Sequence, residues 1–208
     1  MAILTKNISL LTKSILDNEP IAFPTETFFA LGMDGTNPEN IAKIFSIKGR
    51  DKNNPISLLI NDPNQIYNFS KNIPDIAENL MNKYWPGPLT AVIELDQKID
   101  SNITSNNGTA GFRIPDNHIA LSLLKECNVP ITGTSANRSG KPPHKSPIEV
   151  SKDIGKDLKF IYDEVCGEKN FPSTVIDFTK KPYKIVREGS IPYSEITNLY
   201  GKDNFCIK

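Results

Sequence analysis

The chain of 208 residues is 38% hydrophobic and 23% charged, a composition typical of a globular domain and unlike that of disordered, collagen-like or coiled-coil proteins. Lys and Arg together number 24, as do Asp and Glu, so the formal net charge is zero and no excess of positive charge is available to hold a polyanion non-specifically. The three cysteines are far apart and form no Cys-x-x-Cys pair, which argues against a disulfide framework and favours a reducing compartment.

The N-terminal segment predicts an amphipathic helix rather than a leader peptide or a membrane span. Leu4, Ile8, Leu11 and Ile15 recur at the spacing of one helix face. Polar residues such as Lys13 interrupt the apolar run, which is too short to cross a bilayer. We therefore expect a cytoplasmic protein that makes no membrane contact.

Short strands and helices alternate along the rest of the chain. Strands are predicted at residues 21–23, 56–60, 89–95, 110–114, 130–133, 160–162, 174–177 and 183–187. Helices are predicted from Asn37-Pro38 to about residue 48, from Asp62-Pro63, from Ile73-Pro74 to about residue 83, from an Asp116 cap to residue 124, and at 194–200. This mixture predicts one α/β (α+β) domain over residues 1–208, with a mixed β-sheet and flanking helices.

Residues 138–147 are dense in Ser, Gly and Pro. We interpret this segment as a mobile loop over a site rather than a domain boundary, because too few strands follow it to build a second core. The dinucleotide-binding, Walker A and Gly-x-Ser-x-Gly fingerprints are absent. With only His118 and His144 as imidazoles, a zinc site made wholly of protein ligands is not expected.

Arginine is rare in this chain and stands in segments of unusual composition. Only four basic residues are Arg, namely Arg50, Arg113, Arg138 and Arg187, against 20 Lys. A guanidinium binds carboxylates and phosphates as a planar fork, which a Lys ammonium cannot do. Lys48-x-Arg50 at a helix end is either a favourable helix C-terminus or a phosphate clamp. Arg113 lies in an apolar strand and needs an anionic partner if it is buried.

Three turns rich in small hydroxyl and amide side chains follow or precede predicted strands. They are residues 24–27, 134–137 and 173–174. Small polar side chains beside exposed backbone N–H groups make concave anion receptors at strand ends. The alternative is that Thr, Ser and Asn only punctuate these turns.

Seven motifs in order resemble the YrdC family of threonylcarbamoyl-AMP synthases over roughly residues 5 to 190. They are Pro24-Thr25-Glu26-Thr27 with Leu31-Gly32, Lys48-x-Arg50, Trp85-Pro86-Gly87-Pro88-Leu89-Thr90, Arg113-x-Pro115, Thr134-Ser135-Ala136-Asn137-x-Ser139-Gly140, Ser173-Thr174-Val175-Ile176-Asp177 and Arg187-x-Gly189. Two positions depart from the family pattern: Phe29-Ala30 replaces the usual Tyr-Gly, and Asp51 replaces a Pro.

The resemblance implies a YrdC-like single domain whose twisted mixed sheet has a concave ligand-binding face, and no additional C-terminal domain. It implies a nucleotidyltransferase that forms L-threonylcarbamoyl-AMP and pyrophosphate from L-threonine, bicarbonate or CO2, and ATP, for modification of the tRNA adenosine next to the anticodon. Partner proteins would transfer the threonylcarbamoyl group, and contact with tRNA itself would be weak or indirect. The family resemblance also implies a Mg2+ ion, which would be held by phosphate oxygens rather than by protein ligands.

The resemblance also implies residue roles. Lys48 and Arg50 would be catalytic and bind the triphosphate; Ser135, Asn137 and Arg187 would complete the ATP site; and Thr25, Arg113 and Ser173 would hold threonine. Two other functions are considered. One is an RNA-binding or ribosome-associated module without chemistry, against which the zero net charge argues. The other is a carbamoyl-adenylate-forming domain of the hydrogenase-maturation type, which would carry Cys-x-x-Cys pairs that are absent here.

Overall fold

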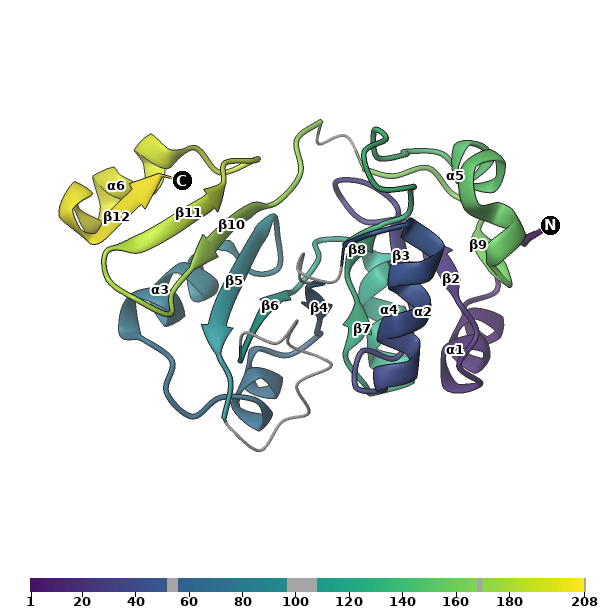
Figure 1. Cartoon of the computed structure of the whole chain (residues 1–208), viewed down its shortest axis with the longest axis horizontal. Coiled ribbons are helices and arrows are strands. Elements are labelled where there is room, and N and C mark those ends of the chain that lie inside the picture. The colour runs from purple at the N-terminus through teal and green to yellow at the C-terminus, as the bar shows by residue number, and fades with distance from the viewer. Residues whose placement is uncertain (52–55, 97–107, 168–169, 208) are drawn as a thin grey trace.

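The computed structural model describes residues 1–51, 56–96, 108–167 and 170–207. The described strands form two mixed sheets side by side, with the chain termini at opposite ends of the molecule (Figure 1). The first sheet has the order β1-β9-β2-β3-β8, and the second has the order β12-β11-β10-β5-β6-β4-β7. The predicted mixed β-structure with flanking helices is confirmed, and it is divided into two sheets. The chain passes from the second sheet to the first between β7 and β8.

The strands of both sheets are short. Those of the first sheet are β1 (Ile3–Thr5), β9 (Phe160–Tyr162), β2 (Ile21–Phe23), β3 (Ala30–Gly32) and β8 (Thr134–Ser135). Those of the second are β12 (Phe205–Ile207), β11 (Tyr183–Arg187), β10 (Thr174–Asp177), β5 (Leu89–Glu94), β6 (Thr109–Arg113), β4 (Leu58–Leu59) and β7 (Ile131–Thr132).

Helices cover both faces of the first sheet. Ile21 and Phe23 of β2 pack with the apolar faces of α1 (Ile8–Leu16) and α4 (His118–Cys127). Ala22 points to the opposite side, where it packs with α2 (Pro38–Lys48) and α5 (Pro147–Ile154). This alternation is the period of two expected of a strand that is buried on both faces.

Among the described residues, helices cover one face of the second sheet and leave the other uncovered. Leu89, Ala91 and Ile93 of β5 pack with α3 (Asp75–Tyr84), α6 (Tyr193–Tyr200) and the 3-10 segment η1 (Pro63–Asn68). Two further 3-10 turns, η3 (Gly155–Asp157) and η4 (Lys202–Asn204), follow α5 and α6. Thr90 and Val92 project to the other face, which is hollowed. The uncovered face therefore presents polar and small side chains toward the first sheet.

Several predicted elements need correction. Leu4 belongs to β1, where it pairs with Ile161 in a parallel register, and the helix begins only after the Asn7 cap. The N-cap of α4 is Asn117 rather than Asp116, because the Asn117 side chain accepts the free backbone N–H groups of the first turn. The helix predicted from Asp62-Pro63 is the 3-10 segment η1.

The segment 138–147 is anchored to α5 by two carboxylates. Glu149 accepts the backbone N–H groups of Lys145 and Ser146, each at 3.1 Å. Asp153 accepts the backbone N–H of Arg138 at 3.0 Å, contacts the Nζ of Lys141 at 2.8 Å and contacts the ring of His144 at 3.0 Å. These contacts lower the pKa of Asp153, although burial of the carboxylate acts in the opposite direction. The segment does border a site, and its mobility stays a prediction.

The described helices do not reach across a membrane. The longest of them, α2, has 11 residues, whereas a helix needs about 20 apolar residues to span a bilayer. None of the helices in the described residues could therefore be a membrane span.

Candidate functional site

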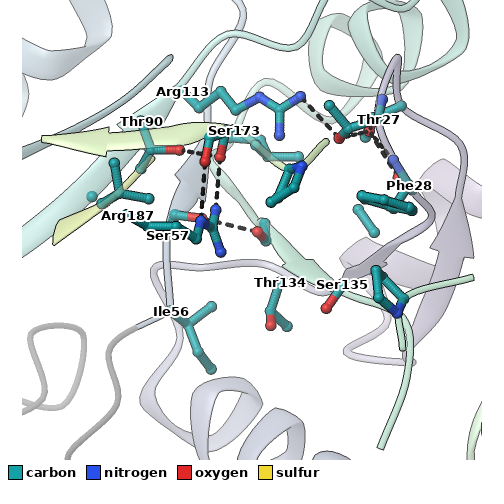
Figure 2. Close-up of a pocket in the computed structure, with 18 of the residues that line it drawn as sticks. Thr27, Phe28, Ile56, Ser57, Thr90, Arg113, Thr134, Ser135, Ser173 and Arg187 are labelled. Atoms are coloured by element: carbon teal, nitrogen blue, oxygen red, sulfur yellow. Dashed lines mark hydrogen bonds between the residues drawn. The ribbon is translucent and has the colours of Figure 1, made fainter. Parts of the chain in front are cut away.

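A hollow of about 620 Å³ opens onto the uncovered face of the second sheet. Its volume lies within the range of small-molecule sites in proteins. Figure 2 shows Thr90, Arg113, Ser173 and Arg187 on one side of the hollow, and Thr27, Phe28 and Ser135 on the other. The hollow is therefore built from both sheets, at the polar turns singled out in the sequence.

The residues predicted to form the site converge. Seven of the eight line the hollow: Thr25, Arg50, Arg113, Ser135, Asn137, Ser173 and Arg187. Lys48 lines an adjoining side pocket together with Arg50, Ser135 and Asn137, which belong to both cavities. Their convergence is a property of the fold, whereas the role of each toward a ligand stays a prediction.

Lys48 joins α2 to the turn that follows β8. The side chain is only 2% exposed, and its Nζ donates to the backbone carbonyls of Ser135 and of Asn137, the latter at 2.8 Å. Gly49 has a positive φ of 59° and ends the helix in the left-handed conformation that glycine adopts without strain. Burial, with a further contribution from the Arg50 charge, lowers the pKa of Lys48 to about 8.

Three guanidinium groups make the hollow positive. Burial lowers the pKa of Arg187, and the nearby charges of Arg113 and Arg50 lower it further. Burial also lowers the pKa of Arg50. Mutual repulsion between cations in one cavity favours an anionic ligand, because an anion there relieves the repulsion and replaces lost hydration.

Arg113 has the anionic partner that its apolar strand requires. Its Nη2 lies 2.5 Å from the Oε1 of Glu26, and both side chains are buried, with exposed fractions of 9% and 7%. Its Nε donates to the carbonyl of Gly87 at 3.2 Å. Sequence reasoning missed Glu26 as the partner because 87 residues separate the two, although Glu26 stands in the first motif.

Ser173 is held between a Thr and an Arg. Arg187 donates from Nε to the Ser173 carbonyl and from Nη2 to the Ser173 hydroxyl, each at 3.0 Å. The hydroxyls of Ser173 and Thr90 are 2.9 Å apart and form a hydrogen bond, which is drawn as a dashed line in Figure 2. Thr90 was not among the predicted site residues, although it ends the third motif.

The hydroxyl of Thr25 organises its own turn. It donates to the Phe28 carbonyl at 2.8 Å, accepts the Thr27 backbone N–H at 3.2 Å, and lies 3.0 Å from the Thr27 hydroxyl. Thr25 therefore fits the alternative in which hydroxyl residues stabilise turns, and it also lines the hollow.

Asn137 has a buried side-chain oxygen, a hydrogen-bond acceptor that lacks a donor among the described residues. Its Nδ2 donates to the carbonyls of Arg138 and Lys141, at 2.9 and 2.7 Å. Its Oδ1 is buried and accepts no hydrogen bond from any part of the chain that the structure describes. Because nearly all buried polar atoms in proteins are paired, this oxygen is suited to accept a hydrogen bond from a bound ligand.

Other residues lining the hollow were missed. They include Thr27, Ser57, Thr134, Lys141 and Pro143. Lys141 and Pro143 come from the segment 138–147, and its predicted place over a site was the signal that could have included them. Ser57 donates to the Gly133 carbonyl at 2.9 Å and so ties β4 to the turn before β8.

Carboxylates are scarce around the hollow. Among the described residues, its lining includes no Asp or Glu, and the side pocket includes Asp51. The described residues also form no cluster of three His, Cys, Asp or Glu side chains that could hold a metal. This donor set fits a metal that is carried mainly by the oxygens of a bound phosphate compound.

Comparison with known proteins finds a matching sequence family and named relatives. The sequence model described as "Telomere recombination" (Sua5_yciO_yrdC) matches residues 13–189. The chain is 36% identical to a threonylcarbamoyl-AMP synthase of Pyrococcus abyssi over 188 residues, which is 90% of this chain and 55% of the relative. It is 32% identical to a Bacillus subtilis protein of the same name, over 89% of this chain and 54% of that protein.

The fold agrees with these similarities. The crystal structure of P. abyssi Sua5 complexed with L-threonine superposes with a TM-score of 0.92 at 32% identity, covering 99% of this chain and 62% of that one. The chain thus spans about half the length of the two curated relatives. The match of residues 13–189, with the fold and the ordered motifs, shows that the chain belongs to the Sua5/YciO/YrdC family.

Proposed function

We propose that the chain is a nucleotidyltransferase that joins L-threonine, bicarbonate or CO2, and ATP into L-threonylcarbamoyl-AMP and pyrophosphate. The observation that carries this proposal is one hollow that gathers Arg50, Arg113 and Arg187 with small hydroxyl-bearing turns. The names of the P. abyssi and B. subtilis relatives, and the L-threonine complex of P. abyssi Sua5, support it.

The proposed reaction fits the charges of the site. A carbamate oxygen attacks the α-phosphate of ATP, the bond to the leaving pyrophosphate breaks, and negative charge is present on every reacting group. Fixed cations lower the barrier by orienting these groups and by stabilising charge without reorganisation. Lys48 and Arg50 would bind the triphosphate. Ser135 and Asn137 would bind ATP with Arg187, and the Asn137 Oδ1 would accept a hydrogen bond from a donor on the nucleotide.

The threonine site would lie on the Arg113 side of the hollow. The Arg113 fork would take the carboxylate, and the hydroxyls of Thr25 and Ser173 would contact the amine or the side chain. Mg2+ bound to the phosphates would supply neutralisation of their charge. We also propose that the product serves tRNA modification in the cytoplasm and passes to separate transfer proteins.

Omitting one substrate at a time tests the proposal. With ATP, L-threonine, bicarbonate and Mg2+ all present, pyrophosphate release is expected to be sustained. It is expected to fall to the background of the enzyme-free mixture when any of ATP, L-threonine or bicarbonate is left out. Release that needs ATP but not threonine would support a different carbamoyl-adenylate chemistry, and RNA binding without any release would support a module without chemistry.

The protonation of Lys48 predicts the pH dependence of ATP use. With a pKa of about 8, Lys48 loses its charge as the pH rises through 8, and the free enzyme then binds phosphates more weakly. We expect kcat/KM for ATP to fall about fivefold between pH 8 and pH 9. In Lys48→Arg the charge persists at both pH values, so the profile is expected to be flat. The same decline in both proteins would contradict the assignment.

A further inference from the structure

Glu26 is a buried carboxylate that stands behind the wall of the hollow rather than in it. It is 6% exposed and is not among the residues that line the hollow. Its Oε1 lies 2.5 Å from the Arg113 Nη2, and its Oε2 accepts the backbone N–H of Asp116 at 3.2 Å. Both carboxylate oxygens are therefore used, and they connect the turn after β2 to the end of β6.

Arg113 is held along one side of its guanidinium. Nε donates to the Gly87 carbonyl at 3.2 Å, while Nη2 contacts Glu26 and lies 3.4 Å from the Thr27 hydroxyl. Nη1 makes no hydrogen bond to the residues that the structure describes. In Figure 2 one terminal nitrogen of Arg113 points to Thr27, and the other points into the hollow. The geometry leaves Nη1 as the donor that faces a ligand.

We propose that Glu26 is a positioning residue, which fixes the plane of the Arg113 guanidinium so that Nη1 faces the carboxylate of the amino-acid substrate. This inference rests on the proposed function and names the residue that prepares its threonine site. Glu26 does not touch the substrate. It acts through Arg113, whose orientation is fixed before the ligand arrives, so less freedom is lost on binding.

The negative charge of Glu26 matters as well as its shape. Arg113 is buried, and its charge acts on the nearby Arg187 together with the charge of Arg50. A neutral partner at position 26 would remove the carboxylate that Arg113 contacts at 2.5 Å and leave its repulsion with Arg187 uncompensated. The contact with the Glu26 carboxylate gives Arg113 a fixed place. Loss of the charge alone should therefore disorder Arg113, even where a hydrogen-bond acceptor remains.

The test compares Glu26→Gln with the wild type by two independent measurements. Calorimetry of L-threonine binding without ATP is expected to give a Kd about tenfold higher in the variant, and the KM for ATP is expected to stay within about twofold. The chain has only four arginines, so the Nε–Hε signal of Arg113 is identified by its loss in Arg113→Lys. Hydrogen exchange at this Hε is expected to be about tenfold faster in Glu26→Gln.

Glu19→Gln is the matched control. It removes a carboxylate whose pair with Lys43 is exposed and 3.6 Å apart, and neither measurement should change. If Glu26→Gln does not fold, Glu26→Asp replaces it, because Asp keeps the charge on a shorter side chain. Its threonine Kd and its Arg113 Hε exchange rate are both expected to rise above the wild-type values, by less than tenfold.

The outcomes separate this inference from the proposed function. Unchanged threonine affinity in Glu26→Gln, or unchanged protection of the Arg113 Hε, overturns the positioning role. Equal rises in the threonine and ATP constants, with a loss of thermal stability, would indicate a merely structural role and overturn it too. If the wild type binds no threonine, the proposed function fails, and exchange at the Arg113 Hε alone decides whether Glu26 orients Arg113.

Discussion

Replacing Lys48 with Ala is expected to lower kcat/KM for ATP by about 100- to 1,000-fold, the usual cost of removing one preorganised group that stabilises transition-state charge. Lys48 lines the side pocket, and its Nζ donates to the carbonyls of Ser135 and Asn137. The substitution thus removes a cation from the phosphates and also loosens the turn that carries two predicted ATP ligands. Pyrophosphate release at saturating threonine and bicarbonate measures the loss.

Two companion variants separate charge from folding. Lys48→Met keeps the buried aliphatic packing without the charge, and it should lose nearly as much activity as Lys48→Ala. Lys43→Ala removes a half-exposed Lys from the same helix, where it contacts the Asn18 carbonyl and Glu19, and it should retain wild-type activity. Comparable activity in Lys48→Met and the wild type, with both folded by thermal melting, would rule out Lys48 as a phosphate ligand.

Gly189→Ala is expected to damage both stability and threonine use. A Cβ at Gly189 would lie 2.2 Å from the carbonyl oxygen of Pro172 and 2.7 Å from the carbonyl carbon of Ser173. Both are backbone atoms, so the chain must move. We expect a loss of about 1–3 kcal/mol in the free energy of unfolding. Because Ser173 is displaced from Thr90 and Arg187, the KM for threonine should rise about tenfold or more.

Denaturant unfolding and initial-rate kinetics measure these two effects. Gly155→Ala is the matched control, since a Cβ there would lie 3.1 Å from the Oγ and 3.4 Å from the Cβ of Ser151, and 3.9 Å from the carbonyl oxygen of Val150, with no backbone atom at clashing distance. It should change neither quantity appreciably. A Gly189→Ala protein with wild-type stability and threonine KM would show that the turn yields easily, and that Ser173 does not depend on this close approach.

Local signals in the sequence predicted much of the fold. Asn37 followed by Pro38 predicted the start of α2, and the structure confirms both the Asn37 cap and the helix end at Lys48. The turn signals likewise placed the strands that carry the site. Two local signals of helix starts were missed, namely the Asn7 cap of α1 and the capping box of Ser146 and Glu149 that begins α5.

Pairings between distant residues were beyond local reasoning. Leu4 resembles the start of a helix by its spacing, and only its partner Ile161 makes it part of a strand. Arg113 required an anion, and the sequence did not indicate which carboxylate among many would supply it. The convergence of the predicted site residues came from recognising ordered motifs. Thr90 and Lys141 stood in segments that the sequence had singled out, and the coordinates show that both line the hollow.

The place of β9 has a consequence for synthesis of the chain. This strand lies between β1 and β2, and its Phe160 pairs with both Ile3 and Ile21. A ribosome must therefore translate past Tyr162 before the N-terminal strands gain their neighbour. Until then, the edges of β1 and β2 that pair with β9 lack their partner. Strand pairing between residues far apart in the sequence makes folding slow. We therefore expect the nascent chain to need chaperones more than a chain with local strand pairings would.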